Sequence, residues 1–242
     1  MSKKISLNMK FWHDGQPNST RLRNVIYCWN ELKKLSRFLL ENNIDIKTNI
    51  YDFSEHKILE GAIHISYPVG EYKKSEKTNI ILKDESASDF FMMFDSDAFF
   101  DVKDYQKLLN LIESLEPGDV ITFDLGRLDT NIENYLVNNI FYPDKADWNF
   151  AYSGEKIHGP LGRGHIGGLG GVYLCDTKLL LSLGGFDEKY IGWGGEDGDM
   201  LGRIMYSNIP HKIKPERNFF PFHLPHFIDY GNPKFSKRFA DE

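Results

Sequence analysis

The sequence predicts an α/β fold with a mostly parallel central sheet and helices on both faces. Short apolar runs of strand length alternate with stretches of helical periodicity, which is typical of parallel sheets with crossover helices. The run at residues 90–94 is continuously apolar, as expected of a strand buried on both faces. The chain has 242 residues, 41% of them hydrophobic and 26% charged, which is enough for one large globular domain or two coupled halves.

The first part of the chain is predicted to form a β-α-β unit. Strands are expected at residues 5–11 and 46–53, with Asp52 near the end of the second strand. The helix between them, at residues 24–42, has one apolar stripe at helical spacing. A shorter helix over residues 76–83 leads into the central strand.

The second part of the chain contains a long segment that does not fit a regular element. Residues 144–171 are rich in glycine, histidine and aromatic side chains, and a long loop of this kind in a compact domain is usually functional. Residues 129–142 are ambiguous between helix and loop. The other elements are expected in this order: a helix at 102–115, a strand at 120–123, a strand at 172–175, and a short helix at 176–183 that Asp176 caps.

Two carboxylates, Asp95 and Asp97, directly follow the central strand. An unpaired charge inside that strand would be very costly, so both should lie just past its carboxyl end, where open α/β sheets bind ligands. Alternate carboxylates there suit a hard divalent cation, Mg²⁺ or Mn²⁺, that carries a nucleotide diphosphate. The pattern also fits an Asp-rich turn after a core strand, and D-x-D alone does not decide between these interpretations.

A second unusual stretch is G-G-F-D-E-K-Y-I-G-W-G-G-E-D-G-D at residues 184–199. Glycines flank Trp193, and three carboxylates open a predicted helix. Acidic capping, which the helix dipole favours, explains one carboxylate but does not require a tryptophan between glycines. Proteins hold sugars with an aromatic ring that stacks on C–H faces and with acids that bind hydroxyls. We therefore favour a sugar site over a simple helix cap.

These stretches resemble the β-1,4-galactosyltransferase-like glycosyltransferases, whose C-terminal domain carries G-G-F-x(n)-Y-x-G-W-G-G-E-D. The resemblance is specific over residues 170–203 and 90–100, and polypeptide N-acetylgalactosaminyltransferases and bacterial chondroitin-type synthases share the C-terminal pattern. It implies a GT-A fold, a UDP-sugar donor, Mn²⁺ or alternatively Mg²⁺, and inversion at the anomeric carbon. It also implies one domain over residues 1–242, with a nucleotide-sugar-binding half at 1–125 and an acceptor-binding and catalytic half at 126–242.

The resemblance assigns roles by position. Asp97 resembles the metal-binding acid, and Asp95 resembles the acid that contacts the nucleotide. Asp197 resembles the catalytic base, with Glu196 beside it on the acceptor. Trp193 resembles the tryptophan of a mobile loop that closes over donor and acceptor. The N-terminus of the predicted helix is expected to keep Asp197 ionised at neutral pH.

Other predicted site residues rest on less specific matches. The family completes its metal shell with two ligands three residues apart, and His223 and His226 have that spacing here. The galactosyltransferases use Met and His at these places, so the choice between the histidines stays open, with His226 favoured. The basic segment Pro-Phe-Arg-x-Arg of the family is missing. Lys10 and His13 lie there instead, and Lys74 is predicted to reach the phosphates.

The donor sugar is predicted from the glycine-rich loop. Related galactosyltransferases have a tyrosine two residues before a Gly-Gly-Val triplet, and its bulk disfavours an N-acetyl group at C2 of the sugar. Here the triplet is 170–172 and the residue two before it is Gly168. We expect galactose or N-acetylgalactosamine as the donor sugar, with Gly168, Gly171 and Asp52 among the donor- and acceptor-binding residues.

Together these observations predict a metal-dependent inverting glycosyltransferase that moves a hexose from a UDP-sugar to an acceptor hydroxyl. One alternative is a sugar nucleotidyltransferase, which would need a Gly-rich phosphate loop with Arg and Lys after the first strand. Residues 11–15 do not supply it. The other alternative is a non-catalytic sugar-binding protein of the same fold, which would be expected to lose the D-x-D or the base, and both are present.

Composition limits the partners and the location. A formal net charge of −6 gives no general attraction to nucleic acid or anionic lipid, so we expect a glycan or another hydroxyl acceptor rather than a nucleic acid. No apolar run reaches membrane-spanning length, and the first residues lack the apolar core of a signal peptide. A cytoplasmic location in a bacterial or viral setting is the expectation. Cys28 and Cys175 are predicted to be buried free thiols.

Overall fold

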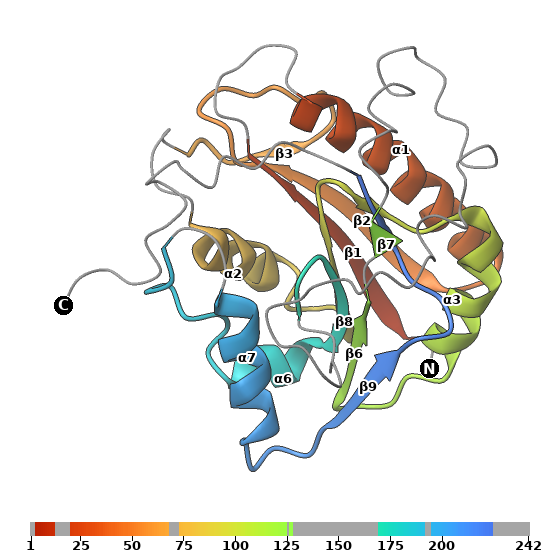
Figure 1. Ribbon diagram of the computed structural model, residues 1–242, viewed down its shortest axis with the longest axis vertical. Helices are drawn as coiled ribbons and strands as arrows, with labels where there is room; N and C mark the ends of the chain where they lie inside the picture. Colours follow the sequence, from red (N-terminus) through yellow and green to blue (C-terminus); the bar gives the residue numbers. More distant parts are fainter. Residues whose placement is uncertain are drawn as a thin grey trace.

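The computed structural model describes residues 3–12, 20–67, 73–124, 126–127, 169–191 and 195–224. Strands and helices alternate along most of this part of the chain (Figure 1). In chain order the elements are β1 (Lys4–Phe11), α1 (Thr20–Glu41), β2 (Asp45–Asp52), β3 (Ile63–His64), α2 (Lys74–Asp84), β4 (Phe90–Asp95), β5 (Ala98–Phe99), the 3₁₀ helix η1 (Val102–Asp104), α3 (Tyr105–Glu113), β6 (Asp119–Phe123), β7 (Gly126–Arg127), β8 (Val172–Asp176), α6 (Thr177–Ser182), α7 (Glu196–Met205), β9 (Lys212–Glu216) and β10 (Phe222–His223).

Seven strands form the central sheet in the order β3-β2-β1-β4-β8-β6-β9. Strand β8 runs antiparallel to both of its neighbours, and the other pairs are parallel. The predicted mostly parallel α/β sheet is therefore confirmed. Strand β8 comes from the second half of the chain and lies between β4 and β6 from the first half, so both halves share one sheet.

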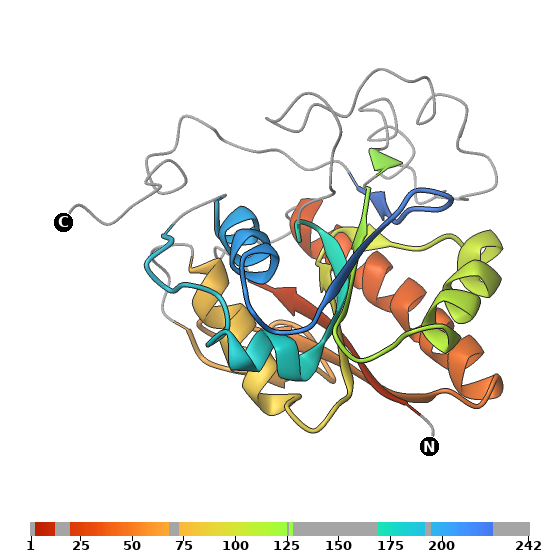
Figure 2. The same ribbon diagram turned by 90° about the horizontal axis from the view of Figure 1, so that it is seen from below.

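The central strand β4 divides its side chains between two hydrophobic clusters. Phe90, Met92 and Phe94 pack with apolar residues of α1 and α3. Phe91 and Met93 point to the other face and pack with residues of α2, α6 and α7. Figures 1 and 2 show these two groups of helices on opposite sides of the sheet. Both cysteines are free and buried, as predicted.

The carboxyl ends of β1 and β4 meet the start of β8 at one edge of the sheet. The parallel register pairs Lys10 with Asp95 at the ends of the two strands. The backbone N–H of Asp95 donates to the carbonyl of Gly171 at 2.7 Å, just before β8 begins. Open α/β sheets place their ligand sites at this kind of edge.

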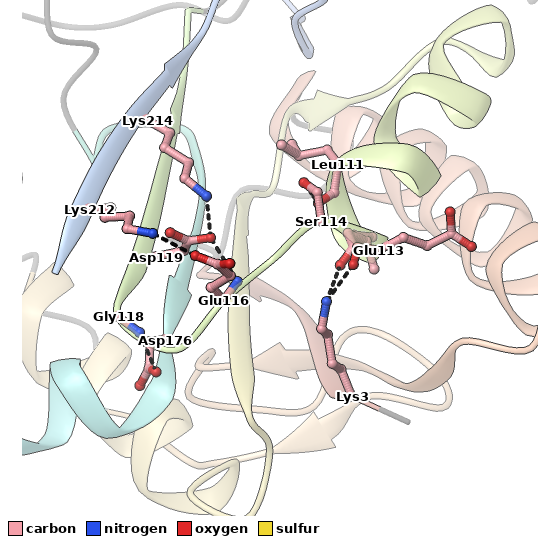
Figure 3. A network of polar contacts seen from close by, with 11 residues as sticks. Lys3, Leu111, Glu113, Ser114, Glu116, Gly118, Asp119, Asp176, Lys212 and Lys214 are labelled. Atoms are coloured by element: carbon pink, nitrogen blue, oxygen red, sulfur yellow. Dashed lines mark hydrogen bonds and ion pairs between the residues drawn. The ribbon is translucent and has the colours of Figure 1, made fainter. Parts of the chain in front are cut away.

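Polar contacts at the opposite edge tie the strand ends together. Figure 3 shows Lys212 and Lys214 of β9 in ion pairs with Glu116 and Asp119, at 2.6 and 2.5 Å. Asp176 at the end of β8 accepts a backbone N–H of α6 at 2.9 Å, which is the predicted cap. These charges have structural partners on the side of the sheet away from Asp95.

Candidate active site

The D-x-D motif ends the central strand. Asp95 is the last residue of β4, and Asp97 lies in the turn that leads into β5. Strand β10 pairs antiparallel with β5, which places His223 opposite Ala98. As a result His223 Nε2 lies 3.2 Å from Asp97 Oδ1. The pairing of β10 with β5 thus places the His223 imidazole beside the D-x-D motif.

This acid–imidazole pair fits a divalent metal. Carboxylate oxygens are common ligands of Mg²⁺, Ca²⁺ and Mn²⁺, and imidazole nitrogens are common ligands of Zn²⁺, Fe²⁺ and other transition metals, so the pair suits a divalent cation without selecting one. Across the residues that the structure describes, no group of three His, Cys, Asp or Glu side chains could hold an ion. His226, the favoured ligand from the sequence, lies outside those residues, so its role stays a prediction.

A second polar cluster joins α2 to α7. Glu196 and Asp197 are the first two residues of α7, and Lys74 is the first residue of α2. The Lys74 ammonium donates to Asp197 Oδ2 at 2.8 Å and lies 2.9 Å from Glu196 Oε1. One cation therefore bridges both carboxylates, where the sequence suggested a contact with phosphates.

Glycines allow the backbone to approach this cluster closely. Gly195 precedes α7 with a φ of 98°, a conformation that side chains rarely adopt. A Cβ on Gly170 would lie 3.4 Å from Asp197 Oδ2, so the loop before β8 passes directly beside the carboxylate. Gly171 has a φ of 81° and turns the chain from that loop into β8.

Burial shapes the charges of the two acids. Burial raises the pKa of Asp197 to about 7, and the nearby negative charges of Glu196 and Asp95 add to the rise while Lys74 opposes it. For Glu196 burial also acts to raise the pKa, but the Lys74 charge and hydrogen bond outweigh it, and the net pKa is lowered. Burial therefore acts against the expectation that the helix N-terminus keeps Asp197 fully ionised at neutral pH.

The two oxygens of Asp197 have different surroundings. Oδ2 accepts the hydrogen bond from Lys74. Oδ1 is buried and has no hydrogen-bond partner among the residues the structure describes. A buried acceptor without a donor is uncommon in folded proteins, and substrate is one explanation for it.

Lys10 is a further charge at this edge that the sequence identified only weakly. Its ammonium lies 3.6 Å from Asp95 Oδ1 and donates to Thr78 Oγ1 at 3.3 Å. Burial lowers its pKa, although the charges of Asp95, Asp197 and Glu196 act in the other direction. The signal in the sequence was the position of Lys10, where the family has its basic segment, and the register with β4 shows that Asp95 is its partner.

Asp52, a further predicted site residue, has a structural role instead. Asp52 is fully buried, and its carboxylate accepts the backbone N–H groups of Ser54, Ile58 and Leu59 at 2.7–3.1 Å. These bonds give it a structural part in the loop after β2. Trp193, Gly168 and His13 lie outside the described ranges, as do residues 129–142 and most of the glycine-rich segment 144–171, so what was expected of them stays a prediction.

Comparison with known proteins gives the family context. Residues 150–226 match the family model described as the N-terminal domain of galactosyltransferase. This part of the chain is thus similar to galactosyltransferases. This segment includes the G-W-G-G-E-D motif and His223 and His226. The predicted resemblance to galactosyltransferase-like enzymes is confirmed, and the match supports the assignment as a glycosyltransferase. No curated protein matches the chain.

Solved structures share the fold at low sequence identity. Drosophila β1,4-galactosyltransferase 7, a mutant in complex with manganese, UDP-Gal and xylobiose, has a TM-score of 0.54 and 11% identity, and the match covers 99% of this chain and 77% of that one. A Pyrobaculum calidifontis mannosyltransferase in complex with GDP-Man and Mn²⁺ has a TM-score of 0.53 and 12% identity, and the match covers 96% of this chain and 59% of that one. GalNAc-T7 with UDP, GalNAc and Mn²⁺ has a TM-score of 0.52 and 12% identity, and the match covers 93% of this chain and 44% of that one.

The fold is the GT-A fold of glycosyltransferases, as the sequence predicted. Within the described helices, none is long and apolar enough to cross a membrane.

Proposed function

We propose that this protein is a metal-dependent, inverting glycosyltransferase that transfers galactose or N-acetylgalactosamine from a UDP-sugar to a hydroxyl of a glycan acceptor. The observation that carries the proposal is that two groups of polar side chains lie at the same edge of the sheet. One is the acid–imidazole pair of Asp97 and His223. The other is Asp197, a buried carboxylate with one oxygen bound by Lys74 and the other without a partner among the described residues.

The donor end of the site is assigned to the D-x-D turn. Asp97 and His223 would hold a divalent cation, with His226 as a further candidate. When bound, this ion supplies positive charge to the diphosphate and makes it a better leaving group. The galactosyltransferase and GalNAc-T7 structures contain manganese together with UDP-Gal or UDP, which supports this assignment. The mannosyltransferase binds GDP-Man, so the family match is what favours UDP here.

The acceptor end is assigned to the start of α7. Asp197 accepts the proton of the acceptor hydroxyl while the acceptor oxygen forms a bond to C1 of the sugar. The bond from C1 to the diphosphate oxygen breaks on the opposite face, and its electron pair leaves with UDP. A single displacement of this kind inverts the anomeric carbon. Glu196 is proposed to bind the acceptor beside Asp197, and Trp193 to close the site against water.

The test is release of UDP from a panel of UDP-sugars, with and without Mn²⁺, in the presence of candidate glycan acceptors. Mn²⁺-dependent release from UDP-galactose or UDP-N-acetylgalactosamine is the expected result, and NMR of the product should show an inverted anomeric configuration. Binding of the donor without release would identify a sugar-binding protein instead. Exchange of pyrophosphate into nucleoside triphosphate would identify a nucleotidyltransferase.

A further inference from the structure

Lys74 occupies a place that a lysine does not normally favour. It is the first residue of α2, where the helix dipole already contributes positive charge. Its side chain is also largely buried, at 10% exposure, which penalises a cation without close partners. The two carboxylates at the start of α7 compensate both costs, because Lys74 lies within 2.9 Å of each. The pairing of these two helix starts is therefore a specific feature of the site.

The pairing constrains Asp197 through one oxygen only. Lys74 holds Oδ2, and Gly170 lies near the same oxygen, which an added Cβ would meet at a van der Waals distance of 3.4 Å. Oδ1 has no partner among the described residues. The Lys74 contact therefore favours the orientation of the carboxylate in which Oδ2 faces the ammonium and Oδ1 does not.

We propose that Lys74 is a positioning residue that fixes Asp197 through Oδ2 and leaves Oδ1 as the oxygen that accepts the acceptor proton. This inference rests on the proposed function, and it gives Lys74 a different role from the phosphate contact suggested by the sequence. In the step, the proton moves from the acceptor hydroxyl to Oδ1. The acceptor oxygen bonds to C1, and UDP departs with the electron pair of the broken bond.

Charge gives this arrangement a measurable signature. Among the described residues, the titratable groups that act on Asp197 are, by element, Lys74 on α2, Glu196 on α7, Asp95 on β4, Lys10 on β1 and Tyr173 on β8, and the Glu196 side chain also interacts directly with that of Asp197. Lys74 is the cation that contacts it and opposes the rise in its pKa. A base works when ionised, so activity is present above the pKa and is lost as pH falls through it. Removing Lys74 raises the pKa and should move the acid limb to higher pH by about 1–3 units.

The experiment compares Lys74→Met with the native protein in steady-state kinetics from pH 5 to about 10.5, which spans the native acid limb and the shifted one. The expected result is a fall in kcat at pH 7 of at least about tenfold, part of the usual general-base contribution. The acid limb should move upward, and the affinity for UDP with Mn²⁺, measured by calorimetry, should stay within about twofold of the native value because the same metal and nucleotide contacts remain. Lys74→Arg restores a cation and should return the acid limb toward its native position.

Lys77→Met is the matched control. Lys77 lies one turn further along α2, is also buried, and faces the rings of Tyr67 and Trp12 at 4.4 and 5.0 Å. Its replacement removes a buried lysine from the same helix but should leave the acid limb where it is. If both variants move the acid limb equally, the shift results from losing any buried lysine of α2, and the specific role proposed for Lys74 is wrong.

A large loss of UDP affinity in Lys74→Met with an unmoved acid limb would overturn the proposal and return Lys74 to the phosphates. If Lys74→Met does not fold, Lys74→Gln provides the same test with a polar neutral side chain. A second readout needs no turnover: ¹³C NMR of the Asp197 carboxyl should show a higher pKa in the variant. A native protein that transfers no sugar would refute the proposed function, whereas an unchanged carboxyl titration would refute the Lys74 contact.

Discussion

Two features of Asp197 have opposite effects on the pKa of its carboxyl group. Burial raises this pKa, and the nearby Lys74 ammonium lowers it. Asp197→Asn keeps the shape of the side chain but removes the proton acceptor. We expect turnover to fall by about 10²–10⁴ while UDP binding survives. In the native protein a pKa of about 7 predicts activity that rises as pH increases through 7 and is lost below it.

Asp199→Asn is the matched control for this change. Asp199 lies on the same helix two residues later and forms an ion pair with Arg203 at 2.8 Å. Its replacement alters one carboxylate at the start of α7 without removing the proposed base. Near-normal turnover in Asp197→Asn would mean that Asp197 only caps the helix, and Glu196 would be the next candidate.

The proposed metal ligands give a second prediction at the scale of single residues. Asp97→Ala should abolish Mn²⁺-dependent UDP binding, because water cannot replace the charge of the carboxylate. His223→Ala should weaken Mn²⁺ affinity, since its ring lies 3.2 Å from Asp97. Calorimetric titration of Mn²⁺ in the presence of UDP measures both. Glu113→Ala, which removes an exposed carboxylate from α3, serves as the control.

His226→Ala in the same titration decides between the two histidines. A larger loss of Mn²⁺ affinity in His226→Ala than in His223→Ala would support the prediction that His226 is the metal ligand. Unchanged Mn²⁺ affinity in Asp97→Ala would refute the metal assignment as a whole.

Donor choice depends on the predicted role of Gly168. The absence of a bulky side chain there predicts that UDP-galactose and UDP-N-acetylgalactosamine both serve as donors, because an N-acetyl group at C2 meets no wall. Gly168→Tyr should therefore disfavour UDP-N-acetylgalactosamine selectively. Direct competition between the two donors measures this. Equal rejection of N-acetylgalactosamine by both proteins would mean that Gly168 does not line the C2 pocket.

Single residues also show where sequence reasoning stops. Asp95, Asp97, Glu196 and Asp197 were found because local motifs carry them. The partner of Lys74 was not found, since a contact between the starts of two helices leaves no trace in local spacing. Asp52 was placed in the site because it ends a strand, but buried backbone N–H groups that follow it in the chain use its carboxylate.

At the scale of elements, helix α2 supports the site twice. Near its start it carries Lys74, and in its middle Asn79 bonds to the backbone of Phe186. The Asn79 amide donates to the Phe186 carbonyl at 2.8 Å, its oxygen accepts the Phe186 N–H at 2.7 Å, and the amide also reaches Glu188 at 2.8 Å. One side chain therefore fixes the Gly-Gly-Phe turn, whose segment leads on to α7.

Asn79→Ala should destabilise the protein by about 1–3 kcal/mol, because it leaves buried backbone groups of the turn without partners. Urea denaturation followed by tryptophan fluorescence measures the loss. Asn110→Ala on α3 is the control, since the side chain of Asn110 is exposed and accepts a hydrogen bond from Gln106, which lies on the same exposed helix surface. A loss equal to that of the control would show that the turn does not depend on Asn79.

The elements themselves were mostly predictable. Apolar periodicity predicted the α-helices and the five longer core strands β1, β2, β4, β6 and β8 to within a few residues of their observed bounds. The two-residue strands β3, β5, β7 and β10 were not predicted, because two residues carry no periodicity. The direction of β8 was not predictable, because strand polarity has no signature in the pattern. Strand β9 was missed because it is a half-exposed edge strand with two lysines and a proline, so it has no apolar run.

At the scale of the whole molecule, the proposed site is assembled from distant parts of the chain. Asp95 ends β4 and Asp97 follows it, Asp197 is the second residue of α7, and His223 lies on β10. The central sheet connects them, because β8 lies between β4 and β6. The fold class was evident from composition and alternation, but the closeness of these groups depends on pairing between strands far apart in sequence.

A site built across the chain couples ligand binding to global stability. UDP with Mn²⁺ binds the native state only, so at one hundred times its dissociation constant it should stabilise the protein by about 2.7 kcal/mol. For a domain of this size that corresponds to a rise in Tm of about 5–10 °C, which differential scanning fluorimetry can measure. Asp97→Ala should lose the rise because the metal contact is gone. Asp197→Asn should keep it, since the proposed base does not hold the nucleotide. Loss of the rise in both variants would contradict the separation of donor and acceptor ends on which the mechanism depends.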